Sequence, residues 1–129
     1  MRTLQPAGWP RPRGYANGIE ASGRTIFVAG QIGWDETETF VAKDFVGQFE
    51  QALRNILAVL AEADAGPEHV VRLTWFVTDK KAYLSEARRV GEAYREVMGR
   101  NFPVMSVVEV SALMEDEALV EIEATAVVP

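Results

Sequence analysis

The sequence of 129 residues contains no cysteine and only one histidine, His69. Without cysteine the chain has no disulfide, no thiolate nucleophile and none of the usual zinc or iron–sulfur ligand sets. A metal site would have to be built from carboxylates around His69, and no spacing in the sequence does so, so we expect no metal. Because His69 follows Gly66-Pro67, we interpret it as a solvated loop residue rather than the base of a catalytic triad.

The sequence also lacks a long apolar run and a concentrated positive charge. No stretch approaches the roughly 20 apolar residues that span a bilayer, and the N-terminus has no charged-then-apolar signal pattern, so we expect no membrane association and a cytoplasmic location. The formal net charge is −6, and the adjacent Arg88 and Arg89 are flanked by Glu86 and Glu92. Phosphate backbones are bound by concentrated positive surfaces, so we expect no nucleic acid partner.

What is present is typical of one ordinary globular domain, which we predict over residues 1–129. Hydrophobic residues make up 48% of the chain and charged residues 25%, and this length suffices for one core but not for two. The first 14 residues contain Pro6, Pro10 and Pro12 together with two glycines. We expect an extended, irregular lead-in over 1–14, with Trp9 packed as an anchor.

Residue patterns predict the element order β-β-α-β-α-β-β. Two β-rich runs flank Ser22-Gly23 and are expected to form a hairpin. Apolar residues at helical spacing predict a helix from the N-cap Asp44 to a stop at Gly66-Pro67, with Gln48 on its polar side, and a second helix that ends at Gly99. Further strands are expected over 69–78, 102–110 and 119–127.

These elements predict an α+β fold in which both helices cover one face of a mixed sheet of four to six strands. The strands carry apolar residues on both faces, so the face without helices should be buried by another copy of the chain. We therefore expect a homo-oligomer with ligand sites in the clefts between subunits.

Two acids interrupt the last strand. Its alternation places Val120 and Ile122 on one face and Glu121 and Glu123 on the other. An unpaired buried carboxylate is costly, so each acid either lies at an exposed or interface-paired position or belongs to a cleft with a chemical role. The strand pattern alone favours the first interpretation.

Several short motifs fall in the order and spacing of the Rid (reactive intermediate deaminase) family, also called the YjgF or L-PSP endoribonuclease-like family. These motifs are Tyr15-Ala16-Asn17-Gly18, Val28-Ala29-Gly30-Gln31, Asn55-Ile56-Leu57, Phe102-Pro103, Val108-Glu109-Val110 and the run over 120–126. The chain resembles this family over about residues 14–128. The resemblance implies a chorismate mutase-like (YjgF-like) fold and a homotrimer around a barrel-like core with small-molecule clefts at the subunit interfaces. It also implies a cofactor-free hydrolysis of imines and enamines, such as 2-aminoacrylate, to a carbonyl compound and ammonia.

The resemblance also implies site residues. Tyr15 corresponds to the cleft tyrosine of the family, Gly30 and Gln31 to its backbone-lined turn, and Glu121 to its water-orienting glutamate. We predict that Tyr15 and Glu121 are catalytic. Gly30 and Gln31 are predicted to bind the substrate.

Three positions depart from the family pattern. Met105 stands where the family has its signature arginine, Val107 stands where a cysteine is frequent, and Gly91 stands at the asparagine of the second helix. A thioether has neither the charge nor the donors with which a guanidinium holds a carboxylate, so we expect weak activity or none on 2-aminoacrylate. Met105, Val107 and Trp34 are expected to line a more apolar pocket.

Arg72 and Arg100 are the two candidates for supplying positive charge to that pocket from another direction. The sequence does not decide whether either of them compensates for the missing arginine.

Two functions stay open at this stage. The first is hydrolysis of an imine or enamine that is larger and less anionic than 2-aminoacrylate, with Glu121 as the general base and Tyr15 positioning the water or the substrate. The second is binding of a small metabolite, or a ligand-responsive interaction, without catalysis. Ribonuclease activity rests only on the older family name. The acidic composition and the absence of a histidine pair argue against it.

Overall fold

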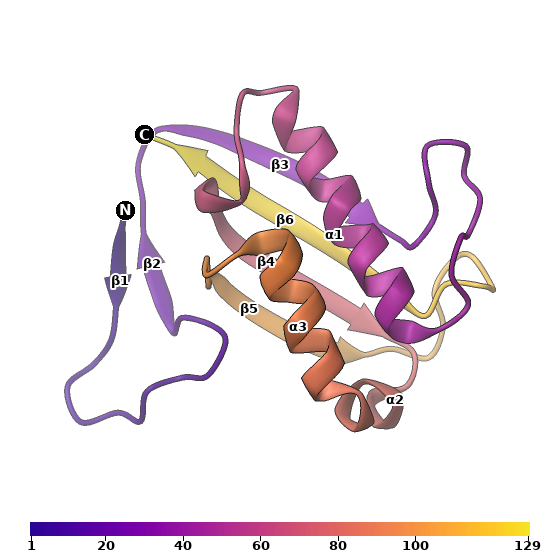
Figure 1. The fold of residues 1–129 in the computed structure, drawn as a ribbon. Helices are drawn as coiled ribbons and strands as arrows, with labels where there is room; N and C mark the ends of the chain where they lie inside the picture. The colour runs from indigo at the N-terminus through magenta and orange to yellow at the C-terminus, as the bar shows by residue number, and fades with distance from the viewer.

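The computed structural model describes all residues from 1 to 129. The chain forms strands and helices in the order β1 (Arg2–Leu4), β2 (Gly18–Glu20), β3 (Arg24–Gln31), α1 (Phe45–Ala61), the 3-10 helix η1 (Pro67–His69), β4 (Val70–Val77), α2 (Lys80–Ser85), α3 (Ala87–Met98), β5 (Val104–Glu109) and β6 (Val120–Val128) (Figure 1).

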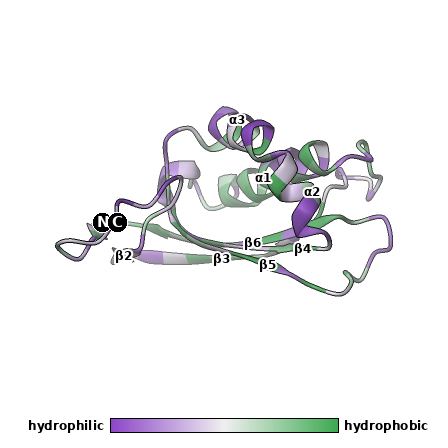
Figure 2. Cartoon of the chain, turned by 90° about the horizontal axis from the view of Figure 1, so that it is seen from below, coloured by the Kyte–Doolittle hydropathy of each residue, from purple (hydrophilic) through white to green (hydrophobic).

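The main sheet has four strands in the order β3-β6-β4-β5. β6 is antiparallel to both of its neighbours, whereas β5 is parallel to β4, so the sheet is mixed. Figure 2 shows the helices on one side of this sheet and no helix on the other. The predicted α+β architecture, with helices on one face of a mixed sheet, is confirmed.

The core lies between α1 and the central strands. Asp44 is the predicted N-cap, and its side chain accepts a hydrogen bond from the Gly47 amide, which satisfies one of the free donors of the first turn. The helix buries one apolar stripe against alternate residues of β4 and β6. The fully buried side chains of this contact are Phe49, Leu53, Ile56 and Leu60 from α1, Leu73 and Val77 from β4, and Val120 and Ile122 from β6. The alternation predicted for the last strand is therefore confirmed.

The predicted first hairpin is wrong. β2 pairs with β1 in a separate two-stranded sheet, and β3 pairs with β6. Gly23 has a positive φ of 142°, and a Cβ there would lie 2.1 Å from the Val128 carbonyl oxygen, so the chain passes tightly against the end of β6. Ser22-Gly23 thus carries the chain between two sheets and does not close a hairpin.

The lead-in also differs from the prediction. It contains β1, which makes its first residues regular rather than irregular. Trp9 is 59% exposed and does not anchor it. The prolines and glycines follow in the loop that joins β1 to β2, where no ladder hydrogen bond is required of them.

Both predicted helices end or break at different points. α1 ends at Ala61, before Gly66-Pro67, and Asp64 beyond it has a left-handed φ of 53°. The second predicted helix is two helices, α2 and α3, because the backbone leaves the helical region at Glu86 (φ −108°, ψ 17°). Gly99 does end α3.

Gln48 is buried, although its place in the helical pattern predicted the polar side. Its amide donates to the carbonyls of Ala42 (3.2 Å) and Glu117 (3.0 Å) and accepts from the Leu119 amide (2.8 Å). Burial is tolerated because the amide is hydrogen-bonded through both its nitrogen and its oxygen to the two loops. Periodicity alone gave no sign of those loops.

His69 lies in the 3-10 helix η1 and is half-buried, whereas the sequence predicted a solvated loop residue. Its Nδ1 accepts a hydrogen bond from the Gly66 amide at 3.0 Å. No three His, Asp or Glu side chains gather in a way that could hold a metal ion. No helix has the length and apolar character that crossing a membrane requires.

Candidate functional site

Glu121 and Gly30 lie together where β3 bulges away from β6. The two strands are in register up to Val28 opposite Ala124, and then Gln31 lies opposite Ile122, so β3 has one extra residue. A Cβ on Gly30 would lie 2.5 Å from Glu121 Oε2 and 2.9 Å from its Cγ. Only glycine leaves room for the carboxylate to rest on this part of the backbone.

The negative charge of the Glu121 carboxylate has no ion-pair partner within the chain. Glu121 is half-buried, and its alternation with the buried residues of β6 turns it to the sheet face without helices. None of the ion pairs of the chain includes it. Gln31 follows Gly30 on β3 and pairs with Ile122, and its amide donates to the Ala29 carbonyl at 3.1 Å. The structure thus brings two predicted site residues, Gly30 and Glu121, into direct contact, and Gln31 is the next residue along β3.

The loop after β3 carries Trp34. Asn55 on α1 donates to the carbonyls of Ile32 (3.1 Å) and Trp34 (2.8 Å), which fixes the loop to the helix. The Trp34 ring packs on Phe40, with ring centroids 5.9 Å apart. The structure therefore places Trp34 in a local aromatic contact of its own loop, and the cavity that contains Met105 does not include it.

Asp35 organises the same loop. Its carboxylate accepts hydrogen bonds from the Thr37 hydroxyl (2.6 Å), the Thr37 amide (2.8 Å) and the Thr39 amide (3.2 Å). The hydrogen bond from the Thr37 hydroxyl is the largest of the causes that hold the pKa of Asp35 below its ordinary value. This acid is a structural feature of the loop.

A cavity of about 390 Å³ lies under α2 and α3, beside β5, and contains Tyr15, Met105 and Val107. Met105 and Val107 lie opposite Leu73 and Trp75 of β4 in the parallel ladder, so they face the helices. The remaining lining residues are Arg13, Gly14, Trp75, Tyr83, Ala87, Val90, Gly91, Tyr94, Arg95 and Phe102. The expected apolar character of this pocket is found in its aromatic and aliphatic lining.

Tyr94 is a wall of this cavity. Its hydroxyl donates to the Asn101 carbonyl, and its ring stacks on Phe102 with centroids 5.9 Å apart. Burial raises the pKa of the Tyr94 hydroxyl well above its ordinary value, so the group stays a neutral donor. Tyr94 therefore shapes the cavity wall and does not transfer a proton.

The predicted site residues form two separate groups in one chain. Met105 and Val107 face the helices from β5, which is one edge of the sheet, whereas Gly30 lies on β3, the opposite edge. Glu121 alternates with buried residues of β6 and therefore faces away from the helices. A single copy of the chain does not bring Glu121 and Met105 into one cleft.

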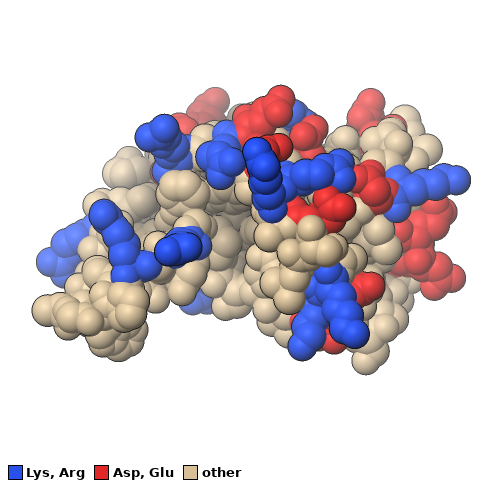
Figure 3. Space-filling model, turned by 60° about the horizontal axis from the view of Figure 1, so that its bottom comes forward, with Lys and Arg blue, Asp and Glu red and all other residues tan.

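Arginines other than one at position 105 lie at this pocket. Arg13 and Arg95 both line the cavity that contains Met105. Arg72 and Arg100 each line a neighbouring cavity that shares Tyr15. The fold brings together arginines that are far apart in sequence, and Figure 3 shows Lys and Arg side chains on both sides of a hollow in this face of the molecule.

Arg13 and Arg95 were missed because neither belongs to a motif. Arg95 looks like one charge among many on the solvated face of a helix. A glycine in the interior of that helix, Gly91, was the only signal that could have pointed to it. Glycine costs about 1 kcal/mol relative to alanine in a helix interior and therefore often marks a close approach.

Comparisons with known proteins show the family. The family model described as Endoribonuclease L-PSP matches residues 10–128. A RutC family protein of Pyrococcus abyssi is 40% identical over 119 residues, which cover 91% of this chain and 89% of that protein. The human 2-iminobutanoate/2-iminopropanoate deaminase is 31% identical over 105 residues, covering 81% of this chain and 73% of the relative.

Solved structures show the same fold. A Yersinia pestis protein of the conserved Rid family, YyfB, whose function is described as unknown, superposes with a TM-score of 0.86 at 32% identity and covers 98% of both chains. The sequence match and the fold lead to the same assignment. The chain belongs to the Rid/YjgF family, whose family model is named for endoribonuclease L-PSP.

Proposed function

We propose that the protein hydrolyses an imine or enamine to a carbonyl compound and ammonia, in clefts between the subunits of a homotrimer. Family membership supports a deaminase-like or small-molecule-binding function, and one relative is named as a deaminase of 2-iminobutanoate and 2-iminopropanoate. The observation that carries the proposal is the half-buried Glu121 carboxylate, seated on Gly30 without an ion-pair partner in its own chain.

Such a carboxylate is suited to general base catalysis. Glu121 would take a proton from water while the water oxygen bonds to the imine carbon, and the electrons of the C=N double bond would pass to the nitrogen, which gains a proton. The hydroxyl proton of the resulting carbinolamine then passes to the nitrogen, C=O forms as the C–N bond breaks, and ammonia leaves. A positioned base of this kind contributes about 10²- to 10⁴-fold to a rate.

Assembly would supply what one chain lacks. The sheet face without helices exposes 78% of Phe27, and Arg72, Thr74 and Glu123 surround it in a shallow cavity. An exposed aromatic on a bare sheet supports burial against another copy. In the proposed trimer the Glu121 group of one chain would lie against the β5 edge of its neighbour, where the Met105 cavity opens.

The substrate would be larger than 2-aminoacrylate. Met105 provides no charge at the position of the family arginine. The cavity around it has a volume of about 390 Å³ and is lined mainly by aromatic and aliphatic side chains. A short substrate would leave most of this wall unfilled. We expect the reaction to take place in the cytoplasm and to need no cofactor.

Ammonia release from imines generated in the assay tests this proposal. Glu121→Gln keeps the size of the side chain and removes the base, so turnover should fall by at least about 100-fold while the trimer remains. Glu123→Gln is the matched control, since Glu123 lies two residues away on the same face of β6. Unchanged turnover in Glu121→Gln would remove Glu121 from the mechanism.

A protein that only binds a metabolite is the alternative. The separation of Glu121 from the cavity within one chain favours it, because binding in the cavity needs no contribution from Glu121. Molecular mass in solution, measured for wild type and Phe27→Glu, decides whether copies associate through the bare face. A monomeric wild type without ammonia release would favour simple binding.

A further inference from the structure

The cavity beside β5 has an apolar wall and a positive rim. Trp75, Tyr83 and Met105 belong to the wall, while Arg13 and Arg95 lie at the same cavity. No aspartate or glutamate lines it. The volume of about 390 Å³ lies in the range of small-molecule sites.

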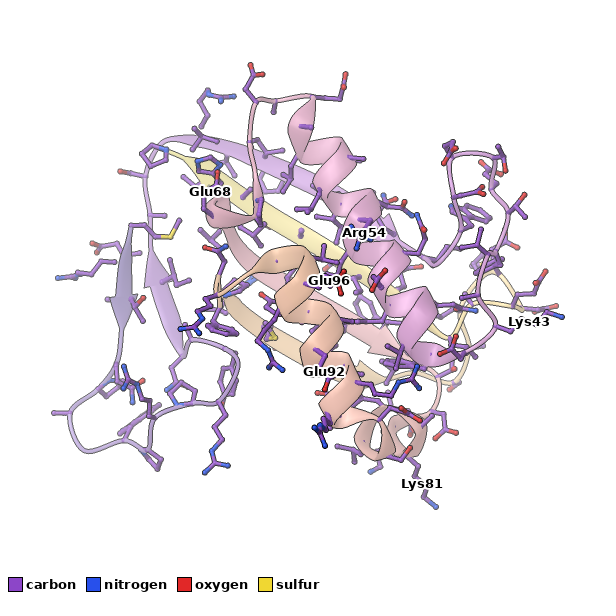
Figure 4. All side chains as sticks on the ribbon, viewed as in Figure 1. Lys43, Arg54, Glu68, Lys81, Glu92 and Glu96 are labelled. Atoms are coloured by element: carbon purple, nitrogen blue, oxygen red, sulfur yellow. The ribbon has the colours of Figure 1, made fainter.

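Neither arginine of the rim is neutralised by the protein. The ion pairs of the chain involve other arginines. The acids of α3 are engaged elsewhere, since Glu92 pairs with Arg88 at 3.4 Å and Glu96 approaches Arg54 at 4.0 Å. Figure 4 shows Glu96 on the side of α3 that faces Arg54 on α1. The rim therefore has positive charge available for an external anion.

Gly91 makes the room that the Arg95 guanidinium occupies. A Cβ on Gly91 would lie 3.3 Å from Arg95 Nη1, so the guanidinium folds back along α3 over the glycine one turn earlier. Helical side chains lean in this direction, toward the N-terminus. A larger side chain at position 91 would compete with the guanidinium for this space. Gly91 thus lowers the stability of α3 locally, and in return it leaves room for the Arg95 guanidinium at the cavity.

We propose that this cavity binds a monocarboxylate with a bulky apolar or aromatic body. Arg95, with Arg13 beside it, holds the carboxylate, and Trp75, Tyr83 and Met105 contact the body. A guanidinium holds a carboxylate through paired, charge-assisted hydrogen bonds, and the apolar wall rewards a ligand that fills it. The position of Arg95 on a helix distinguishes this anion site from the β5 position that Met105 fills.

This inference deepens the proposed function by naming the substrate class, namely imino acids with large apolar side chains. Only that naming rests on the proposed function, because carboxylate binding needs neither turnover nor Glu121. Under this inference the substrate is larger than 2-aminoacrylate and keeps its carboxylate, which differs from the less anionic substrate that the sequence predicted.

Titration calorimetry with 3-phenylpropanoate, its neutral amide and acetate tests the binding. Wild type should bind 3-phenylpropanoate at least about 10-fold more tightly than the amide, since a charged hydrogen bond contributes about 1.5–3 kcal/mol and 1.4 kcal/mol is tenfold in affinity. Acetate has the charge without the body and should bind more weakly still.

Variants assign the effect to Arg95. Arg95→Met should reduce affinity for 3-phenylpropanoate to that for the amide and leave the amide unchanged, Arg95→Lys should retain part of the preference, and Gly91→Asn should weaken it. Arg88→Met is the matched control, because Arg88 lies on the same helix, pairs with Glu92 and lies outside the cavity. Circular dichroism establishes that each variant is folded.

The outcomes separate the two proposals. Equal affinity for acid and amide, no measurable binding of 3-phenylpropanoate, or an unchanged preference in Arg95→Met would overturn the carboxylate site. If the preference depends on Arg95 but no imine is hydrolysed, the site stands and the proposed hydrolysis fails. If ammonia is released from imines and Arg95→Met affects neither binding nor rate, the hydrolysis stands and this site is wrong.

Discussion

The Glu121 carboxylate rests directly on the backbone of Gly30, so close that a Cβ on the glycine would lie 2.5 Å from Oε2. The bulge in β3 creates this contact, because the extra residue before Gln31 shifts the glycine beside the acid. Two strands far apart in sequence therefore fix the place of one carboxylate. Its orientation depends on the absence of a side chain at residue 30.

Gly30→Ala should displace the carboxylate and lower turnover to about the level of Glu121→Gln. The new methyl would overlap three side-chain atoms of Glu121, all within 2.9 Å, and the flexible acid would have to rotate away. We expect a loss of imine hydrolysis of about 100-fold or more and a loss of stability of about 1–3 kcal/mol from the overlap.

Ala29→Ser is the control for that measurement, since the neighbouring side chain is exposed and adds one hydroxyl to the same strand. Rates of ammonia release and urea unfolding would be compared for both variants. Wild-type turnover in Gly30→Ala would mean that the orientation seen here has no bearing on catalysis.

Asn55→Ala should loosen the loop that carries Trp34. The amide of Asn55 serves two carbonyls, Ile32 and Trp34, and its loss leaves both without this donor. The free energy of unfolding should fall by about 1–3 kcal/mol, measured by urea titration. Asn55→Asp should be at least as damaging, because a carboxylate cannot donate to either carbonyl.

Arg54→Ala provides the reference for Asn55, since Arg54 is the preceding residue on α1 and its ion pairs are exposed. We expect a change within about 0.5 kcal/mol for it. Equal effects at the two positions would contradict the assigned role of Asn55.

We expect the stabilising contribution of Asp35 to be lost in acid. Its pKa is lowered from 3.8 in the folded chain, chiefly by the hydrogen bond from the Thr37 hydroxyl. The unfolded chain therefore takes up a proton before the folded chain does, so the contribution of Asp35 is complete above pH 3.8 and is lost as pH falls through the lower folded pKa. The stability difference between wild type and Asp35→Asn should be constant near pH 7 and shrink below about pH 4. Urea unfolding at a series of pH values measures it; a difference that grows with acid would contradict the assignment.

How far the sequence predicts this protein depends on the range of each interaction. The Asp44 cap, the α1 stripe and the alternation around Glu121 follow from local periodicity and were predicted correctly. The pairing of β2 was not, because Ser22-Gly23 satisfies the local rule for a hairpin while Val128, distant in sequence, decides the path of the chain.

In the candidate site, too, some residues could be predicted from the sequence and others depend on contacts between distant segments. Family motifs identified Gly30 and Glu121, and the fold brings them together. Arg13 and Arg95 were not predicted, since their approach to Met105 depends on how the first loop and α3 pack around β5. Such a cluster has no sequence spacing by which it could be recognised.

Met105→Arg tests whether the departure from the family pattern sets the substrate. A guanidinium at this position of β5 would hold the carboxylate of a short substrate, and gaining such a contact is worth at least about 2 kcal/mol, or about 30-fold. The variant should hydrolyse 2-aminoacrylate at least about 30-fold faster than wild type, measured as ammonia release in competition with semicarbazide. Met105→Leu keeps the volume without a charge and should behave as wild type. Rapid hydrolysis of 2-aminoacrylate by the wild type would show that Arg95 or Arg13 already serves short substrates, and that Met105 does not determine which imine is hydrolysed.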